Sequence, residues 1–466
     1  DAVTAAKVAS SGAFAIGATG TSSSLAGIPF FSDTTNGSIY THDVSGTDST
    51  AARNTAYGLT TLDAITTGDD NTVMGHAAGT ALQDGAENVA IGTNSMAAAT
   101  SAGQNTCVGH NSGAALSSGS LYNVLLGHGA GASMTTGNRN IAIGVSSMDG
   151  FDTEAHNLGI GISALGGSVA GGEYNVAIGN YTLDALTSGD KNTVVGYDAG
   201  TAITEANNCV LIGYEAGKAI TTQNNNICIG YQAGVGITQT NNTLIGVSAA
   251  LSAGAAAENT GVGASCLIHL TNGTDNVALG ESAGADITTG DYNVMIGSNT
   301  EGSTANAQSQ NVIGYNVTAS GNNTFTFGSG SDDTTCTNGA TSFSNPSDVR
   351  IKKDIETSTC GLSFINDLRP VNFKFKTKGE LDTDFYLYEK DSTEPASFTD
   401  QVVNGFIAQE VKAVIDNHPE YKGDELWKEG LEKHDKRQRL SKEALIPIIV
   451  KAIQDLSDKV KALEDA

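Results

Sequence analysis

The stretch NTVVGYDAGTAITEANNCVLIGYEAGKAI (192–220) holds two copies of one short motif, and this motif decides the fold. In its usual form the motif is Asn-x-x-aliphatic-Gly, and it recurs from NTAYG (54–58) to NVMIG (293–297) before loosening into NVIG (311–314) and TFTFG (324–328). Most steps between successive motif glycines are 17 residues long. A fixed period of this length is typical of a repeat architecture.

The length of the repeat predicts the architecture. A unit of 17 residues is too short for a helical crossover, but it has room for two short strands and two turns. Each unit is therefore predicted to form one coil of a parallel β-solenoid or β-roll, with about sixteen coils in all. The recurring Gly and Asn are expected at the corners, where positive φ angles and side-chain-to-backbone hydrogen bonds are needed. The fold class is mainly β.

The strand of each coil is apolar on both of its faces. The residue before the motif Gly is large and aliphatic, as at Ile178 and Val195, and the residue before that one, as at Ala177 and Val194, is apolar too. A strand that is apolar on both faces is covered on both faces. One roll has a single interior, so we expect the second face to meet other chains, as in a three-fold bundle or homotrimer.

Charge divides the chain into two regions. The whole sequence has 24 basic and 50 acidic residues, a net charge of −26, but residues 1–346 carry only 5 of the basic residues. Such a negative surface repels nucleic acid, which we exclude as a partner. The sequence has no apolar run of the length needed to span a membrane, so membrane insertion is not expected.

These patterns give a domain plan. We predict an N-terminal cap (1–53), the repeat region (54–328), a Gly/Ser/Thr-rich linker (329–346), a small α+β domain (347–445) and a C-terminal helix (446–466). Because the sequence starts at Asp1 and not at Met, it is compatible with a further N-terminal segment such as a signal peptide or an anchoring domain.

The C-terminal helix carries a heptad pattern. Its apolar residues are spaced alternately three and four apart, which predicts a coiled coil. The alternative is an amphipathic helix that packs on its own domain. The residues of the pattern are Ile446, Ile449, Ile453, Leu456, Val460 and Leu463.

The repeat resembles those of known fibrous proteins. It is similar to the left-handed β-roll heads of trimeric autotransporter adhesins, although the unit is longer here. It is more similar to the Asn-Thr-x-x-Gly-Tyr-x-Ala repeats of phage tail fibres, as in NTVVGYDAG (192–200) and NICIGYQAG (226–234). This resemblance implies an architecture, and it does not indicate a ligand.

Four C-terminal segments carry a second resemblance, namely NPSDVRIKKDIE (345–356), GLSFINDLRPVNFKFK (361–376), NGFIAQEVKAVI (404–415) and LSKEALIPIIVKAIQDLSDKVKALED (440–465). In this order they resemble the C-terminal intramolecular chaperone of endosialidase-type tailspikes and other phage fibres, a self-cleaving peptidase family. The resemblance implies a trimeric chaperone that aligns three chains and is then released by autoproteolysis.

The same resemblance implies the site residues. Ser347 corresponds to the reactive serine of the family and Lys352 to its lysine, while Asp348 and Arg350 complete the motif. The bond to be cut precedes the serine and joins Pro346 to Ser347. Without the family, a Ser and a Lys at this spacing would be ordinary surface residues.

The proposed chemistry sets a condition on the lysine. A hydroxyl is a poor nucleophile until a base takes its proton. A lysine acts as that base only where burial or neighbouring cations, here Arg350 and Lys353, lower its pKa. The enzyme activity expected is thus a single-turnover serine autoproteolysis, with no cofactor and no metal site.

Three tyrosines follow the motif Gly in successive coils. Tyr197, Tyr214 and Tyr231 form either a strip that binds sugar or a ladder of stacked side chains that stabilises the roll. The sequence leaves both interpretations open.

The function predicted from these features is a trimeric tail fibre or attachment protein, in a virion or extracellular, whose receptor is a cell-surface glycan or protein. One alternative is a polysaccharide depolymerase, which needs two carboxylates in a groove; Asp69, Asp190 and Asp291 instead lie in turns. The other is a bacterial trimeric surface adhesin, although the chain ends in a charged helix, KALEDA (461–466).

Overall fold

The fold is that of a computed structural model of the chain. It describes residues 23–25, 28–33, 35–41, 49–168, 171–330, 332–340, 343, 347–383, 387–397, 400–428 and 438–466. The chain divides into two compact units, residues 1–346 and residues 347–466, and each unit is taken by itself below.

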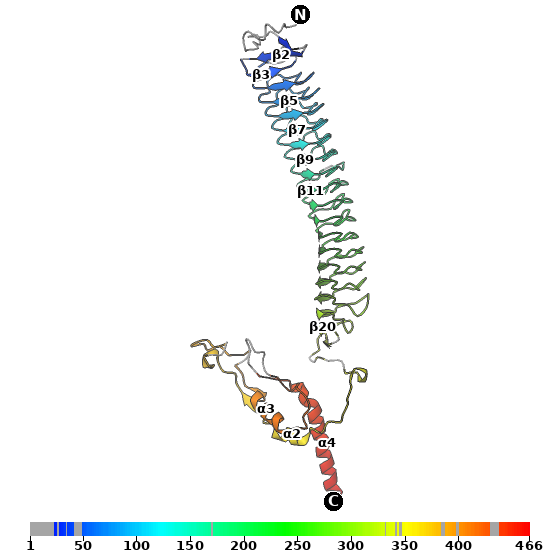
Figure 1. The fold of residues 1–466 in the computed structure, drawn as a ribbon, viewed down its shortest axis with the longest axis vertical. Helices are drawn as coiled ribbons and strands as arrows, with labels where there is room; N and C mark the ends of the chain where they lie inside the picture. Colours follow the sequence, from blue (N-terminus) through cyan, green and yellow to red (C-terminus); the bar gives the residue numbers. More distant parts are fainter. Residues whose placement is uncertain are drawn as a thin grey trace. The chain divides into compact units, whose positions relative to one another are not determined.

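The first unit is a parallel β-solenoid of about 17 turns, in which each coil contributes one short strand. Strand β5 pairs with β6 in register, Val73 opposite Ala90, and every later strand repeats this pairing with the strand of the next coil, which produces the stack seen in Figure 1. The stacked strands are β4 (Thr55–Tyr57), β5 (Thr72–Met74), β6 (Val89–Ile91), β7 (Thr106–Val108), β8 (Val124–Leu126), β9 (Ile141–Ile143), β10 (Leu158–Ile160), β11 (Val176–Ile178), β12 (Thr193–Val195), β13 (Val210–Ile212), β14 (Ile227–Ile229), β15 (Thr243–Ile245), β16 (Thr260–Val262), β17 (Val277–Leu279), β18 (Val294–Ile296), β19 (Asn311–Tyr315) and β20 (Thr324–Ser329).

Antiparallel strands stand at both ends of this stack. At the N-terminal end β1 (Ser23–Leu25), β2 (Ile28–Asp33) and β3 (Ser38–Tyr40) pair in sequence, and β3 then pairs in parallel with β4. At the other end β21 (Asp332–Thr337) pairs antiparallel with β20. The stretch 329–346, predicted as a linker, therefore begins with a strand. Its pairing satisfies the backbone groups that the last coil would otherwise leave unpaired.

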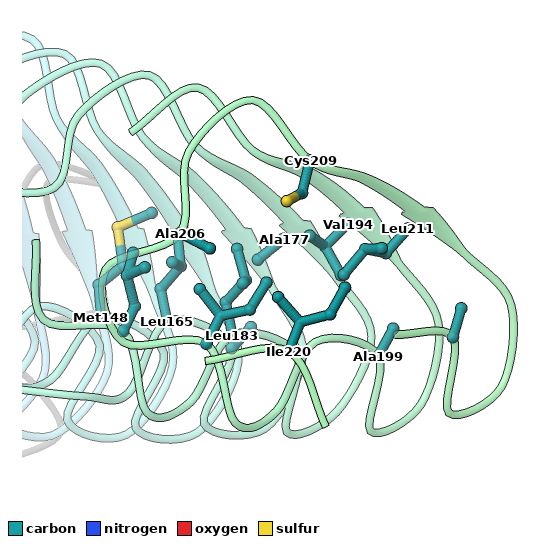
Figure 2. Packing of buried hydrophobic residues seen from close by; sticks show 14 of the residues in the cluster. Met148, Leu165, Ala177, Leu183, Val194, Ala199, Ala206, Cys209, Leu211 and Ile220 are labelled. Carbon is teal, nitrogen blue, oxygen red and sulfur yellow. The ribbon is translucent and has the colours of Figure 1, made fainter. Parts of the chain in front are cut away.

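The core runs through the middle of the coils. The central residue of each strand points inwards and is buried, as Val194 and Leu211 are. Figure 2 shows these strand residues packed with Leu165, Leu183 and Ile220, which come from the turns. The roll thus buries one continuous apolar column.

The second apolar stretch of each unit forms turns, where the sequence predicted a second strand. Leu82 in this stretch is buried, but Ala77 and Gly79 just before it have φ angles of 54° and 53°. Positive φ values at alternate residues are incompatible with an extended strand. The coil therefore has one strand, and its other walls are built from consecutive turns.

Buried asparagines tie successive coils together. The backbone N–H and the Nδ2 group of Asn71 both donate to Oδ1 of Asn54, at 2.9 and 3.1 Å, and Nδ2 also donates to the carbonyl oxygen of Gly85 at 2.9 Å. Most later coils repeat this pattern. Because each amide bonds to the coils on both sides of it, the ladder fixes the register of the stack.

The outer face of the strands is apolar and exposed in the single chain. The third strand residue points outwards, as Met74, Ile212 and Ile313 do, and each of these side chains is well exposed. The sequence predicted that one face of the strand would meet other chains without saying which; in the structure the exposed face is the one that carries the residue before the motif Gly.

The second unit is a small α+β domain. Its elements are the 3₁₀ turns η1 (Val349–Ile351), η2 (Lys378–Glu380) and η3 (Lys442–Ala444), helices α2 (Leu362–Asp367), α3 (Ala408–Asn417) and α4 (Leu445–Glu464), and the paired strands β22 (Val371–Phe373) with β23 (Val403–Gly405) and β24 (Trp427–Lys428) with β25 (Arg439–Leu440). Its core contains Phe364 of α2, Val411 of α3, and Leu445 and Ile448 of α4.

Candidate functional site

A short turn brings the predicted serine and lysine together. Ser347 and Lys352 flank η1, and the backbone N–H of Lys352 closes this turn on the carbonyl oxygen of Val349 at 3.2 Å. The Nζ atom of Lys352 donates to Oγ of Ser347 at 2.6 Å. The two groups are thus in direct contact, as a nucleophile and its base must be.

Asp348 and Arg350 form an ion pair that supports this turn. Asp348 accepts the backbone N–H of Arg350 at 2.8 Å and also binds its guanidinium group, with Nη2 to Oδ2 at 2.6 Å. The hydrogen bond from Arg350 lowers the pKa of the Asp348 carboxyl. The guanidinium of Arg350 is thus engaged by Asp348.

The whole motif is open to solvent in the single chain. Ser347, Asp348, Arg350 and Lys352 are all exposed. Two large apolar side chains beside them, Val349 and Ile355, are 68% and 67% exposed. Pro346, on the other side of the bond to be cut, lies outside the described residues.

Comparison with known families identifies this region. Residues 347–418 match the model of a peptidase family described as the chaperone of endosialidase. This match confirms the resemblance found in the sequence: the chain joins a β-solenoid to an endosialidase-type chaperone region, as in a tailspike or tail fibre. A search of curated proteins found no match to the chain.

The chaperone match begins at a notable position. Its first residue is Ser347, which is also the first residue of the second compact unit. The serine of the candidate dyad is therefore the residue at which the chaperone region starts. The match ends at His418 and leaves helix α4 outside it.

Helix α4 has two apolar faces. Leu445, Ile448 and Ala452 are buried against the chaperone domain, and Oδ2 of Asp455 accepts the backbone N–H of Leu362 at 3.1 Å. The heptad residues predicted from the sequence form the other face, and all of them are exposed; Ile453, for example, is 62% exposed. The helix thus packs on its own domain through one face, and the coiled coil stays a prediction for the other. No helix in the described ranges is apolar enough over a sufficient length to cross a bilayer.

The three predicted tyrosines stack in one column. The ring centroids of Tyr197 and Tyr214 are 5.8 Å apart and those of Tyr214 and Tyr231 are 5.3 Å apart, with the planes nearly parallel. The ring of Tyr181 meets Tyr197 edge-on. Stacking covers the ring faces, which sugars use for stacking, and leaves the edges to solvent. Sugar binding by this column stays a prediction.

A second column of side chains was not singled out from the sequence. It consists of the residue directly before the motif Asn in each coil, and this residue has a left-handed φ angle throughout, for example 62° at Tyr122 and 57° at Arg139. It lies at the other end of the strands from the tyrosine column. The signal was present in YN (122–123), RN (139–140), HN (156–157), YN (174–175) and KN (191–192), where bulky or charged residues precede Asn.

The chaperone domain also contains a histidine between two carboxylates. Nδ1 of His418 lies 2.6 Å from Oε1 of Glu420, and its Nε2 lies 2.8 Å from Oδ2 of Asp367. The imidazole is buried and packs edge-on against Phe364. The hydrogen bond to Glu420, followed by that to Asp367, raises the pKa of His418. This site joins α2 to the end of α3.

Proposed function

We propose that the chain is the subunit of a homotrimeric viral attachment fibre, whose chaperone region assembles the trimer and is then released by cleavage before Ser347. The observation that carries this proposal is the contact of 2.6 Å between Lys352 Nζ and Ser347 Oγ at the first residue of the chaperone match. A serine and a lysine in contact at a domain boundary are suited to cutting the chain at that boundary.

The cleavage step uses only groups of this motif and water. Oγ of Ser347 attacks the carbonyl carbon of Pro346 while its proton passes to the neutral amine of Lys352. The peptide C–N bond then breaks, and Lys352 returns the proton to the nitrogen of Ser347. Water hydrolyses the resulting ester, which leaves a carboxylate on Pro346 and a free amino group and hydroxyl on Ser347.

In this mechanism, trimerisation provides the burial that Lys352 needs and that the single chain lacks. An amine takes a proton at neutral pH only where its ammonium form is destabilised by burial or by other cations. The motif is exposed in one chain, next to the exposed side chains of Val349 and Ile355. We infer that neighbouring chains cover these side chains in the trimer and thereby bury the dyad, so that cleavage follows assembly.

Two apolar surfaces support the trimer. One is the exposed heptad face of α4, with Ile446, Ile453 and Val460 at one core position. The other core position holds Ile449, Leu456 and Leu463, so this face supports association between helices but does not by itself fix the number of strands at three. The other is the outer face of the stacked strands, which presents aliphatic side chains along the roll.

Denaturing gels of wild-type and variant chains test the cleavage. We expect the wild type to yield fragments corresponding to residues 1–346 and 347–466, and Ser347→Ala to remain whole. Lys352→Met should also remain whole. The matched controls are Ser358→Ala and Lys374→Met, which change exposed residues of the same types outside the motif and should be cut normally.

The outcomes separate the parts of the proposal. Cleavage of Ser347→Ala at the wild-type rate would exclude Ser347 as the nucleophile. A folded but monomeric mass for the uncleaved chain would exclude the trimer.

A further inference from the structure

The left-handed column carries an unusual set of side chains in its middle. Most residues avoid positive φ values, which Asn, Asp and Gly tolerate best. Several coils follow this preference, with Asp70, Asn208, Asn225 and Asn241 in the column. Glu87 and Gln104 follow Asp70 in the column, with Nε2 of Gln104 donating to Oε2 of Glu87 at 3.1 Å, and the next five coils carry the residues that we call the donor strip: Tyr122, Arg139, His156, Tyr174 and Lys191. Since Arg53, Glu258 and Tyr292 hold the same position with similar φ angles, the conformation belongs to the fold, and the strip is distinguished by a donor side chain in each of five adjacent coils.

The side chains of the donor strip support one another by stacking. The guanidinium carbon of Arg139 lies 5.5 Å from the ring centroid of Tyr122. The ring centroids of His156 and Tyr174 are 4.9 Å apart, and their planes differ by 8°. Stacking restricts the rotamers of these side chains before any ligand arrives, which lowers the entropic cost of binding.

The polar ends of the strip are free to bind a ligand. All five side chains are exposed, and in the described part of the chain no hydrogen bond or ion pair engages their polar groups. Hydroxyl, guanidinium, imidazole and ammonium groups all donate hydrogen bonds. The donor groups of successive coils are therefore about 4.8 Å apart along the axis of the roll.

The charge of the strip is opposite to that of the roll. Residues 54–328 contain three basic residues, Arg139, Lys191 and Lys218. Lys218 is paired with Glu215 at 2.6 Å, so both of the unpaired cations lie in the donor strip. Of the carboxylates that precede strip residues in the sequence, Asp190 accepts the backbone N–H of Glu173 at 2.8 Å. The strip itself contains no carboxylate.

We propose that the donor strip binds one chain of a carboxylated polysaccharide that lies along the roll. Arg139 and Lys191 bind carboxylate groups of the glycan, and Tyr122, His156 and Tyr174 donate to its hydroxyl and ring oxygens. A polymer fits this site because the donors repeat along one axis, whereas a small ligand would contact only one or two of them. The inference rests on the proposed attachment function and names the chemical class of the receptor.

Binding of polygalacturonate to the assembled protein tests the inference. The variant Arg139→Asn/Lys191→Asn removes both cations and places Asn where neighbouring coils already have it, so the roll should keep its melting temperature. We expect this variant to bind at least about tenfold more weakly, because each lost charge-assisted hydrogen bond is worth about one such factor or more. The matched control is Lys218→Asn, which removes the paired cation outside the strip and should bind as the wild type does.

Further variants and further ligands test where the site lies and which class of ligand it binds. Tyr174→Asn should also weaken binding, whereas Tyr214→Asn, in the other column, should not. Unchanged binding by the double variant would overturn the site, and equally tight binding of dextran sulfate or neutral dextran would overturn the carboxylate class. Absence of polygalacturonate binding by a protein that trimerises and cleaves itself would overturn this inference alone. A chain that does neither refutes the proposed function instead.

Discussion

The glycine that ends each strand is required by the contact between coils. Gly196 has a φ angle of +145°, and a Cβ atom there would lie 2.2 Å from the carbonyl oxygen of Gly213. The same close approach recurs at the corresponding glycine of neighbouring coils, such as Gly179 and Gly213. The column of glycines thus lets the backbones of successive coils approach one another at this corner.

The substitution Gly196→Ala tests this contact. We expect it to destabilise the roll by at least about 3 kcal/mol, because the strained φ angle and the backbone clash act together. Thermal unfolding followed by circular dichroism measures the effect. Gly321→Ala is the control, since a Cβ atom at Gly321 meets nothing within 4 Å; equal melting temperatures for the two variants would contradict the explanation.

The coil of β13 lacks the asparagine of the internal ladder. Cys209 takes its place, and its Sγ atom lies 3.5 Å from the carbonyl oxygen of Gln223, which the missing Nδ2 group would otherwise bind. We expect Cys209→Asn to stabilise the roll by about 1 to 2 kcal/mol, because it restores hydrogen bonds to buried backbone groups. The melting temperature measures this gain. The reverse change in an adjacent coil, Asn192→Cys, should lower the melting temperature, and a loss of stability in Cys209→Asn would refute the prediction.

His418 makes the stability of the chaperone domain depend on pH. Its carboxylate partners raise its pKa above the ordinary value of 6.5, so the folded state binds a proton more tightly than the unfolded state does. The stabilisation is complete below that ordinary value and is lost as the pH rises through the raised pKa. We expect the melting temperature of this domain to fall as the pH rises above about 6.5, and to fall less in His418→Gln.

The measurement can be confined to this domain. Trp427 is the single tryptophan of the chain, so its fluorescence reports unfolding of the chaperone domain, and Ser347→Ala keeps that domain attached. His269→Gln, in an exposed position of the roll, is the control and should leave the pH profile of Trp427 unchanged. The same pH dependence in wild type and His418→Gln would exclude this histidine as its source.

At the scale of elements, α4 has one face packed on its own domain and one exposed apolar face. Its buried face holds the chaperone domain together, and its exposed face carries the heptad residues. Ile449→Asp/Ile453→Asp should leave the domain folded, because both side chains point away from its core, but it should prevent trimerisation. Sedimentation of chains that also carry Ser347→Ala measures the mass of the assembly.

Ile449→Asp/Ile453→Asp also tests whether trimerisation has to precede cleavage. If burial of the dyad needs the trimer, the Asp variants with Ser347 intact should not be cut. Gln454→Asp adds a charge to α4 outside the heptad residues and should leave both trimer and cleavage intact. Trimers formed by Ile449→Asp/Ile453→Asp would contradict the role of this face.

At the scale of the molecule, the chaperone region should be needed for the trimer to fold, but not for the folded trimer to stay folded. Uncleaved Ser347→Ala chains, unfolded in denaturant and then diluted, should recover trimers, whereas chains from which residues 347–466 have been released should not. Without the region that aligns the chains, the folded state of the roll is maintained by the rate of unfolding rather than by reversible equilibrium. Sedimentation after dilution gives the recovered fraction, and equal recovery of both materials would refute the chaperone role.

The roll could be predicted because each coil repeats the same local requirements. The motif Gly and Asn recur at fixed places in the period, and the repeat predicted the stack of coils from them; that the Asn is buried and that the central strand residue points inwards came from the structure. The second strand of each unit was not predicted correctly, since hydrophobic spacing alone does not reveal alternate positive φ angles such as those of Ala77 and Gly79. Strand β21 was missed as well, because Thr and Asp in a polar stretch gave no alternating apolar pattern.

The sequence by itself determined the solenoid, its period and the division of charge, because these are properties of local spacing and composition, whereas the Ser347–Lys352 motif followed only from the resemblance to a known family. Only the tertiary structure decided which side chains meet across coils or turns. It brought Nζ of Lys352 to Oγ of Ser347, placed the heptad residues of α4 on the exposed face, and aligned the donor strip from five coils. These contacts depend on backbone angles and on how coils stack, and neither follows from the order of residues until the chain is folded.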